Sequence, residues 1–131
     1  LVAQPAAPGT AAAVDEGFVS YRYGEKHAAP VLRFTREGAS AAFHTVLFPF
    51  RDTAPRVCVI EDSSLRGARG FVVTVEQAGQ RSVDYILFPS EDDTIDWPLA
   101  GLSFRGRFLF LRRAADGAVQ RSHHDGVACI G

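Results

Sequence analysis

Two glycine-containing turn signals between short strand-like runs constrain the fold of this chain most. Ala78–Gly79 separates Gly70–Gln77 from Gln80–Phe88, and Asp116–Gly117 follows the run Arg107–Arg113. A short turn signal between two strand-like runs is typical of a β-hairpin. No stretch of useful length has the periodicity of a helix. The sequence therefore predicts an all-β fold, namely an antiparallel β-sandwich of about ten short strands.

The apolar run Ala42–Phe50, which reads AFHTVLFPF, predicts the central strand of this sandwich. Val, Phe and Thr favour an extended backbone, and no polar alternation interrupts the run. Such a strand is typically buried on both faces. We expect the runs at 30–36, 70–76, 83–88 and 107–113 to cover it.

Length and composition indicate one domain with a loosely attached start. The 131 residues suit a single core, which we assign to residues 17–131. Residues 1–16 are rich in Ala and Pro and predict a linker or flexible arm. The chain begins with Leu and contains no Met, which predicts a piece or a processed product of a longer protein.

The charge and the apolar runs argue against two classes of partner. The formal net charge is −1, so no overall basic field favours nucleic acid. No apolar run is long enough to span a bilayer. We therefore expect neither a nucleic acid nor a membrane as a partner.

No motif for a metal, a cofactor or a nucleophile is recognisable. His123, His124 and Asp125 are consecutive, and neighbours on a strand point to opposite faces, although Gly126 favours a turn here. The acidic group near Asp93 lacks the spacing of a calcium loop. The sequence predicts no metal site and no cofactor.

The two cysteines lie in apolar runs and belong to no C-x-x-C motif. Cys58 lies in VCVI and Cys129 in VACI. Free thiols in such runs are common, and a disulfide would form only in an oxidising compartment. Both states remain open at this point.

A cluster of arginines is the strongest candidate for ligand binding. Guanidinium groups recognise carboxylate or sulfate groups through paired hydrogen bonds, and exposed aromatic rings can stack on sugars. The alternative, ordinary surface arginines and core aromatics, stays open. The candidate residues are Arg105, Arg107, Arg112, Arg121, Tyr21 and Trp97.

The stretch Gly17–Pro30, which reads GFVSYRYGEKHAAP, resembles the C-terminal β-sandwich domain of the heparinase II/III-like polysaccharide lyases. The family has the form G-W-V-S-x-x-Y-G-x-K-x-x-A-P, followed by a strand that ends in Tyr-Pro-Tyr or similar. Phe18 replaces the Trp, and Phe48 and Phe50 replace the Tyr residues. The resemblance covers most of residues 17–122, including FLFLRRAADGAV as a closing hairpin. The matching residues are Gly17, Val19, Ser20, Tyr23, Gly24, Lys26, Ala29, Pro30 and Pro49.

This resemblance implies a supporting role. Such bacterial lyases cleave uronic-acid polysaccharides by β-elimination, and their catalytic Tyr and His residues lie in parts that precede this segment. The resemblance therefore implies a non-catalytic module whose partners are the upstream catalytic domains and an anionic polysaccharide. It also implies a periplasmic or secreted protein, with a cytoplasmic location left open.

Two other functions remain as alternatives. The chain could act as a stand-alone carbohydrate-binding module for anionic polysaccharides, using the arginine cluster. A weaker alternative is a small enzyme that uses His44 or His123 as a general base.

Overall fold

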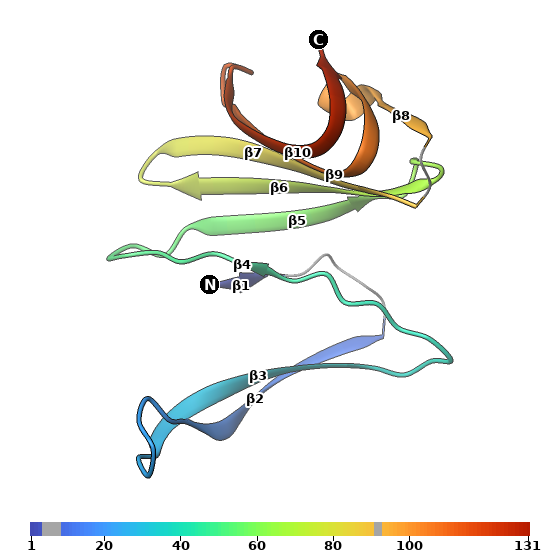
Figure 1. Ribbon diagram of the computed structural model, residues 1–131. Helices are drawn as coiled ribbons and strands as arrows, with labels where there is room; N and C mark the ends of the chain where they lie inside the picture. Colours follow the sequence, from blue (N-terminus) through green and yellow to red (C-terminus); the bar gives the residue numbers. More distant parts are fainter. Residues whose placement is uncertain (4–8, 91–92) are drawn as a thin grey trace. The chain divides into compact units, whose positions relative to one another are not determined.

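The computed structural model of the chain describes residues 1–3, 9–90 and 93–131, and it divides into two compact units. The larger unit comprises Leu1–Ala6 and His44–Gly131, and the smaller one Ala7–Phe43. Over the described residues there are ten β-strands and one short 3-10 helix (Figure 1). Every strand pair is antiparallel, so the predicted all-β class is confirmed. No helix in these ranges is long and apolar enough to cross a membrane.

A six-stranded antiparallel sheet forms the body of the larger unit. Its strands follow the order β10-β9-β7-β6-β5, and β8 pairs with the first part of β9. In Figure 1, β9 and β10 curl strongly at one side of this sheet. The short helix η1 (Pro98–Ala100) connects β8 to β9. The strands are β5 (Arg56–Asp62), β6 (Ala68–Gln77), β7 (Gln80–Pro89), β8 (Thr94–Trp97), β9 (Leu102–Ala114) and β10 (Val119–Ile130).

Both predicted hairpins are present. Gln77 pairs with Gln80 across the β6–β7 turn. Ala78 and Gly79 both have positive φ angles there, 50° and 78°, as a type I′ turn requires. In the β9–β10 turn, the amide of Ala118 donates to the Asp116 carboxylate at 3.0 Å. Local turn chemistry thus places these two connections.

The long strand β9 changes the residues that it buries halfway along its length. Leu102 and Phe104 are buried before Gly106, whereas Leu109 and Leu111 are buried after it. Before Gly106 the even-numbered residues therefore point inward, and after it the odd-numbered residues do. Because side chains alternate strictly along a regular strand, this switch requires one inserted residue.

Arg107 is that inserted residue, in a β-bulge between β9 and β10. Gly126 pairs with Gly106 and Asp125 pairs with Phe108, so Arg107 has no paired residue in β10. A bulge bends its strand and increases the local twist. The bend turns the first part of β9 and β8 back over the sheet, and it creates an enclosed core.

The main core lies in the space that this bend encloses. The indole of Trp97 and the ring of Phe104 are both fully buried there. Leu65, Ala68, Val72, Tyr85 and Ala128 pack around the edge of this cluster. The buried members are Leu87, Ile95, Trp97, Ala100, Leu102, Phe104, Leu109 and Leu111.

A smaller core lies on the opposite face of β5 and β6. It consists of the buried Val59, Val73 and Val75. The two-stranded sheet of β1 (Val2–Ala3) and β4 (Val46–Leu47) supplies residues that pack against it. The larger unit is therefore sandwich-like, with apolar layers on both faces of one sheet.

The prediction that Ala42–Phe50 forms the central, doubly buried strand is wrong. Only Val46–Leu47 is a strand, and it pairs with the two residues of β1. Leu47 is 72% exposed and Phe50 is 43% exposed. Strands β6, β7 and β9, which we expected to cover the run, form the centre of the sheet instead. An unbroken apolar run carries no alternation that would show which neighbour it packs against.

The smaller unit is a single hairpin of β2 (Thr10–Val19) and β3 (His27–Arg36). Strand β2 begins at Thr10, so part of the segment that we assigned to a linker forms a strand. In the sequence of β3, Leu32 and Phe34 alternate with Arg33 and Thr35, which predicts that the two apolar residues share one face. The pairing agrees, since Leu32 faces Val14 across the ribbon and Phe34 faces Ala12. None of residues 9–43 is fully buried.

Candidate functional site

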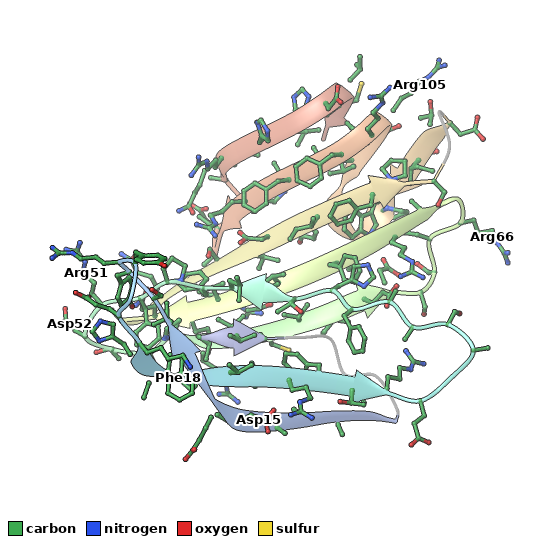
Figure 2. All side chains as sticks on the ribbon, turned by 60° about the horizontal axis from the view of Figure 1, so that its bottom comes forward. Asp15, Phe18, Arg51, Asp52, Arg66 and Arg105 are labelled. Atoms are coloured by element: carbon green, nitrogen blue, oxygen red, sulfur yellow. The ribbon has the colours of Figure 1, made fainter. Side chains whose placement is uncertain are left out.

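The structure does not bring the six candidate ligand-binding residues together. Arg112 and Arg121 are direct cross-strand partners on β9 and β10. Arg105 and Arg107 lie at the bulge, and four residues of β9 or more separate them from Arg112. In Figure 2, Arg105 lies at the opposite end of the sheet from Arg51, which belongs to the rim near Arg112. Tyr21 belongs to the other unit.

Trp97 is not available as a sugar-stacking residue, contrary to our expectation. Its side chain has no exposed surface. The indole Nε1 donates a hydrogen bond to Asp62 Oδ2 at 2.8 Å, and the ring meets Tyr85 edge-on at 5.6 Å. A residue with this burial and a satisfied N–H belongs to the core.

The carboxylate of Asp62 has a lowered pKa because three donors stabilise its charged form. The Ser64 hydroxyl contributes most, followed by the Ser64 amide and then the Trp97 indole. The Ser64 donors lie 2.6 and 3.0 Å from Oδ1. The stability that they contribute is complete above the ordinary pKa of 3.8 and disappears as the pH falls through the lower folded value.

We therefore expect Ser64→Ala to reduce the acid sensitivity of folding. Loss of the Ser64 hydroxyl raises the folded pKa of Asp62 toward the ordinary value, because this hydroxyl contributes most to the lowered pKa. Urea unfolding at several pH values below 5 measures the slope of unfolding free energy against pH, and the slope should become shallower. Ser63→Ala is the matched control, and equal slopes in both variants would contradict the assignment.

Arg112 uses its guanidinium within the fold. Its Nε and Nη2 donate to Asp84 Oδ1 and Oδ2, both at 2.6 Å, in a forked ion pair. Asp84 is 5% exposed, and the pKa of Arg112 is raised because of the hydrogen bonds to this carboxylate. The fork that would bind a carboxylate or sulfate of a ligand is therefore already occupied.

We expect Arg112→Ala to lower the unfolding free energy by about 2–3 kcal/mol. A fully buried pair that loses one partner costs about 3–5 kcal/mol, and the Arg112 side chain is 31% exposed, which lowers this value. Arg121→Ala, on the exposed cross-strand neighbour, should change stability by about 0.5 kcal/mol or less. Urea denaturation followed by tryptophan fluorescence measures the unfolding free energy of both variants. Equal losses of unfolding free energy would contradict the structural role of Arg112.

Beside Arg112 lies an open depression of about 820 Å³ between two hairpin turns and residues 51–53. It carries cations and carboxylates together, so it has no consistent field for an anion. In Figure 2, Arg51 and Asp52 project at this end of the sheet. The charged residues of its lining are Arg51, Asp52, Arg81, Arg112 and Asp116.

A second depression, of about 720 Å³, lies at the β-bulge. Arg105, Arg107 and Asp125 line it, with Pro89, Ser90 and Val127 and the glycines of the bulge. Arg105 and Arg107 therefore line the same depression, and the acidic Asp125 lines it with them.

A row of rings crosses one face of the sheet. Successive ring centroids from His44 through Phe71, Phe88 and Phe108 to His123 lie 4.5, 6.3, 5.4 and 6.2 Å apart. Phe71 is buried, whereas Phe88 is 42% exposed. His44 and His123 therefore lie at opposite ends of the row and form no acid–base pair with each other.

The adjacent histidines lie in β10, not in the turn that we expected at 123–126. His124 contacts Phe104 and its Nδ1 lies 3.0 Å from the Gly126 carbonyl, whereas His123 contacts Phe108. Among the described residues no three metal-ligating side chains gather. Glu91 and Asp92, part of the acidic group near Asp93, lie outside the described residues.

The two cysteines are free and exposed. Cys58 lies on β5 and Cys129 on β10, the strands at the two ends of the sheet order. A disulfide needs Cα atoms within about 7 Å, which is far less than four strand spacings. The alternative of a disulfide between them is therefore excluded in this fold.

The tip of the β2–β3 hairpin, Phe18–His27, holds the candidate Tyr21 and a second exposed ring, Tyr23. Tyr21 is 77% exposed and Tyr23 is fully exposed. Arg22 lies between the two tyrosines in the sequence, and Lys26 follows Tyr23 by three residues. Our sequence analysis did not select these two cations as candidates. The available signals were the alternation of Arg22 with Tyr21 and Tyr23 in the sequence and Lys26 of the family-like motif.

Comparisons with models of known families, with curated proteins and with solved structures find no match for this chain.

Proposed function

We propose that this chain is the non-catalytic C-terminal β-sandwich module of a heparinase II/III-like lyase. The longer protein would cleave uronic-acid polysaccharides by β-elimination, and this module would support its catalytic domains. The observation that carries the proposal is the hairpin β2–β3. It contains the family-like stretch Gly17–Pro30, and none of its residues is fully buried.

The hairpin is an amphipathic ribbon. One face is polar, because Asp15 and Arg33 form an ion pair on it and Thr35 lies beside them. The other face is mainly apolar. Val14 is 71% exposed and Phe18 is 66% exposed on the apolar face. The apolar face also includes Glu16 and, at its end, Thr10 and Arg36, whereas Val19 and Val31 lie on the polar face. The apolar residues of the first face are Ala12, Val14, Phe18, Ala28, Pro30, Leu32 and Phe34.

A two-stranded ribbon gains too little from its own contacts to be stable alone in water. An exposed apolar face of this kind is typical of a surface that packs against another domain. The catalytic domains of a longer protein would supply the partner surface that covers this face of the hairpin. This reasoning supports a module that completes a larger enzyme over one that performs chemistry by itself.

The test uses the longer protein encoded by the complete reading frame. We expect it to release unsaturated uronate from alginate or heparan sulfate, and the isolated chain to release none. Val14→Asp with Leu32→Asp should lower this activity below about a tenth, because two charges would be forced into an apolar contact. Ala13→Asp with Thr35→Asp, on the polar face, is the matched control.

Two results would overturn the proposal. One is a reading frame that encodes no further domain before this chain. The other is isolated chain that releases unsaturated uronate at the rate of the longer protein. A secretion signal in the reading frame would support the periplasmic or secreted location that the proposal implies.

The exposed rings and cations of the hairpin tip favour a second candidate, a stand-alone carbohydrate-binding module for anionic polysaccharides. The same reading frame separates the two functions. A frame with a secretion signal and no catalytic domain would favour the binding module.

A further inference from the structure

The hairpin tip Phe18–His27 concentrates aromatic surface in a way that its packing does not explain. Phe18, Tyr21 and Tyr23 are between two thirds and fully exposed within six residues of sequence. Tyr rings that combine an apolar face with a hydroxyl group are enriched at binding surfaces. Exposed loop tips are more often small and polar. Phe18 belongs to the apolar face of the hairpin, so Tyr21 and Tyr23 are the candidates for contact with a ligand.

Two hydrogen bonds within the tip meet at one carbonyl group. The Ser20 hydroxyl donates to the Arg22 carbonyl at 2.6 Å, and the Glu25 amide donates to the same carbonyl at 3.2 Å. Gly24, with φ of 82°, provides the left-handed residue that the turn needs. Backbone order of this kind lowers the entropy lost when a ligand binds.

Two ring contacts position side chains at the tip. Lys26 Nζ lies 4.8 Å from the centre of the Phe18 ring, and Tyr21 lies 5.6 Å from His27. Both contacts leave the Tyr21 ring largely exposed. The cation and the rings are thus arranged beside each other on one short loop.

The charge of the tip differs in sign from that of the chain. Arg22 and Lys26 are cations, and the single carboxylate, Glu25, lies 3.4 Å from His27. The whole chain has a formal net charge of −1. The tip therefore has a formal excess of one positive charge, which favours an anionic ligand over a cationic one.

We propose that the hairpin tip binds the acidic sugar chain, with Tyr21 and Tyr23 stacked on sugar rings and Arg22 and Lys26 paired with its carboxylate or sulfate groups. The inference rests on the proposed function and names the surface that holds the polymer. A uronic-acid polymer presents an apolar ring face and an acidic group in every unit, which matches the arrangement. Single-stranded nucleic acid also stacks on rings, but two cations and a net negative chain provide few phosphate contacts.

The test measures binding of the full chain to alginate and heparin by isothermal titration calorimetry. We expect Tyr21→Ala with Tyr23→Ala, and separately Arg22→Gln with Lys26→Gln, to weaken binding about tenfold. Arg51→Gln with Arg66→Gln removes the same charge from exposed positions of the other unit and should leave binding unchanged (Figure 2). The conservative pair Tyr21→Phe with Tyr23→Phe keeps the rings and should retain affinity. Added salt should weaken wild-type binding, because ion pairs contribute to it.

Several outcomes would overturn this inference. These are no binding by the wild-type chain, equal weakening by the tip and control variants, equal affinity for an uncharged polymer, or tighter binding of single-stranded DNA. Circular dichroism of each variant establishes that the fold is intact. Lyase activity of the longer protein on saturating polymer tests the proposed function separately, so the two proposals can fail independently.

Discussion

Replacement of Trp97 by Ala should lower the unfolding free energy of the chain by about 3–5 kcal/mol, the range for a large aromatic residue in a closed core. The indole has no exposed surface and meets Tyr85 edge-on. Its loss also leaves the Asp62 carboxylate without its indole donor. Urea denaturation followed by circular dichroism measures the effect, because the variant lacks the only tryptophan.

Two controls separate burial from chemistry at this position. Trp97→Phe keeps most of the apolar surface and loses the hydrogen bond, so it should cost clearly less than Trp97→Ala. Tyr21→Ala, at an exposed aromatic residue, should change stability by about 0.5 kcal/mol or less. If Trp97→Ala were as mild as Tyr21→Ala, the indole would lie on the surface and the described core would be wrong.

Replacement of Gly106 by Ala should destabilise the fold by about 2–6 kcal/mol. The backbone there has a φ angle of 154°, and such a conformation costs about 1–3 kcal/mol with a side chain. A Cβ atom would also lie 2.7 Å from Gly126 Cα and 2.8 Å from the Phe104 ring, and overpacking adds about 1–3 kcal/mol. The bend of β9 depends on this close approach of two backbones.

Gly117→Ala is the matched control for Gly106→Ala. Gly117 also has a positive φ angle, 86°, but a Cβ atom there meets nothing within 4 Å. It should therefore cost only about 1 kcal/mol, the conformational part of the effect. Tryptophan fluorescence during urea unfolding follows both variants, since Trp97 lies in the core that the bend encloses. Equal losses would mean that the bulge does not require a glycine.

Local pattern in the sequence was sufficient for the fold class and several connections. The Ala78–Gly79 and Asp116–Gly117 turns are confirmed because turn geometry depends on the residues in the turn itself. The alternation of Leu32 with Arg33 in β3 likewise follows from the two-residue period of a strand.

The candidate site was only partly predictable, because the sequence does not distinguish an arginine or aromatic residue that is engaged in the fold from one that is exposed. Arg112 is engaged by Asp84, 28 residues earlier, and Trp97 by Asp62, 35 residues earlier. Tyr21 lies in a run, Gly17–Tyr23, whose residues favour a strand, but β2 ends at Val19 and Tyr21 belongs to the hairpin tip. Partners so distant in the chain leave no periodic signal near the residue that they engage.

The sequence by itself determined that this chain forms antiparallel strands, where two of its turns lie and which residues alternate along β3. These are local properties, set by φ and ψ preferences and by the two-residue period. The tertiary structure alone decided the order β10-β9-β7-β6-β5 and the exposure of the run Ala42–Phe50. One inserted residue, Arg107, exchanges the buried and exposed residues of β9, and such a shift is decided by pairing with β8 and β10.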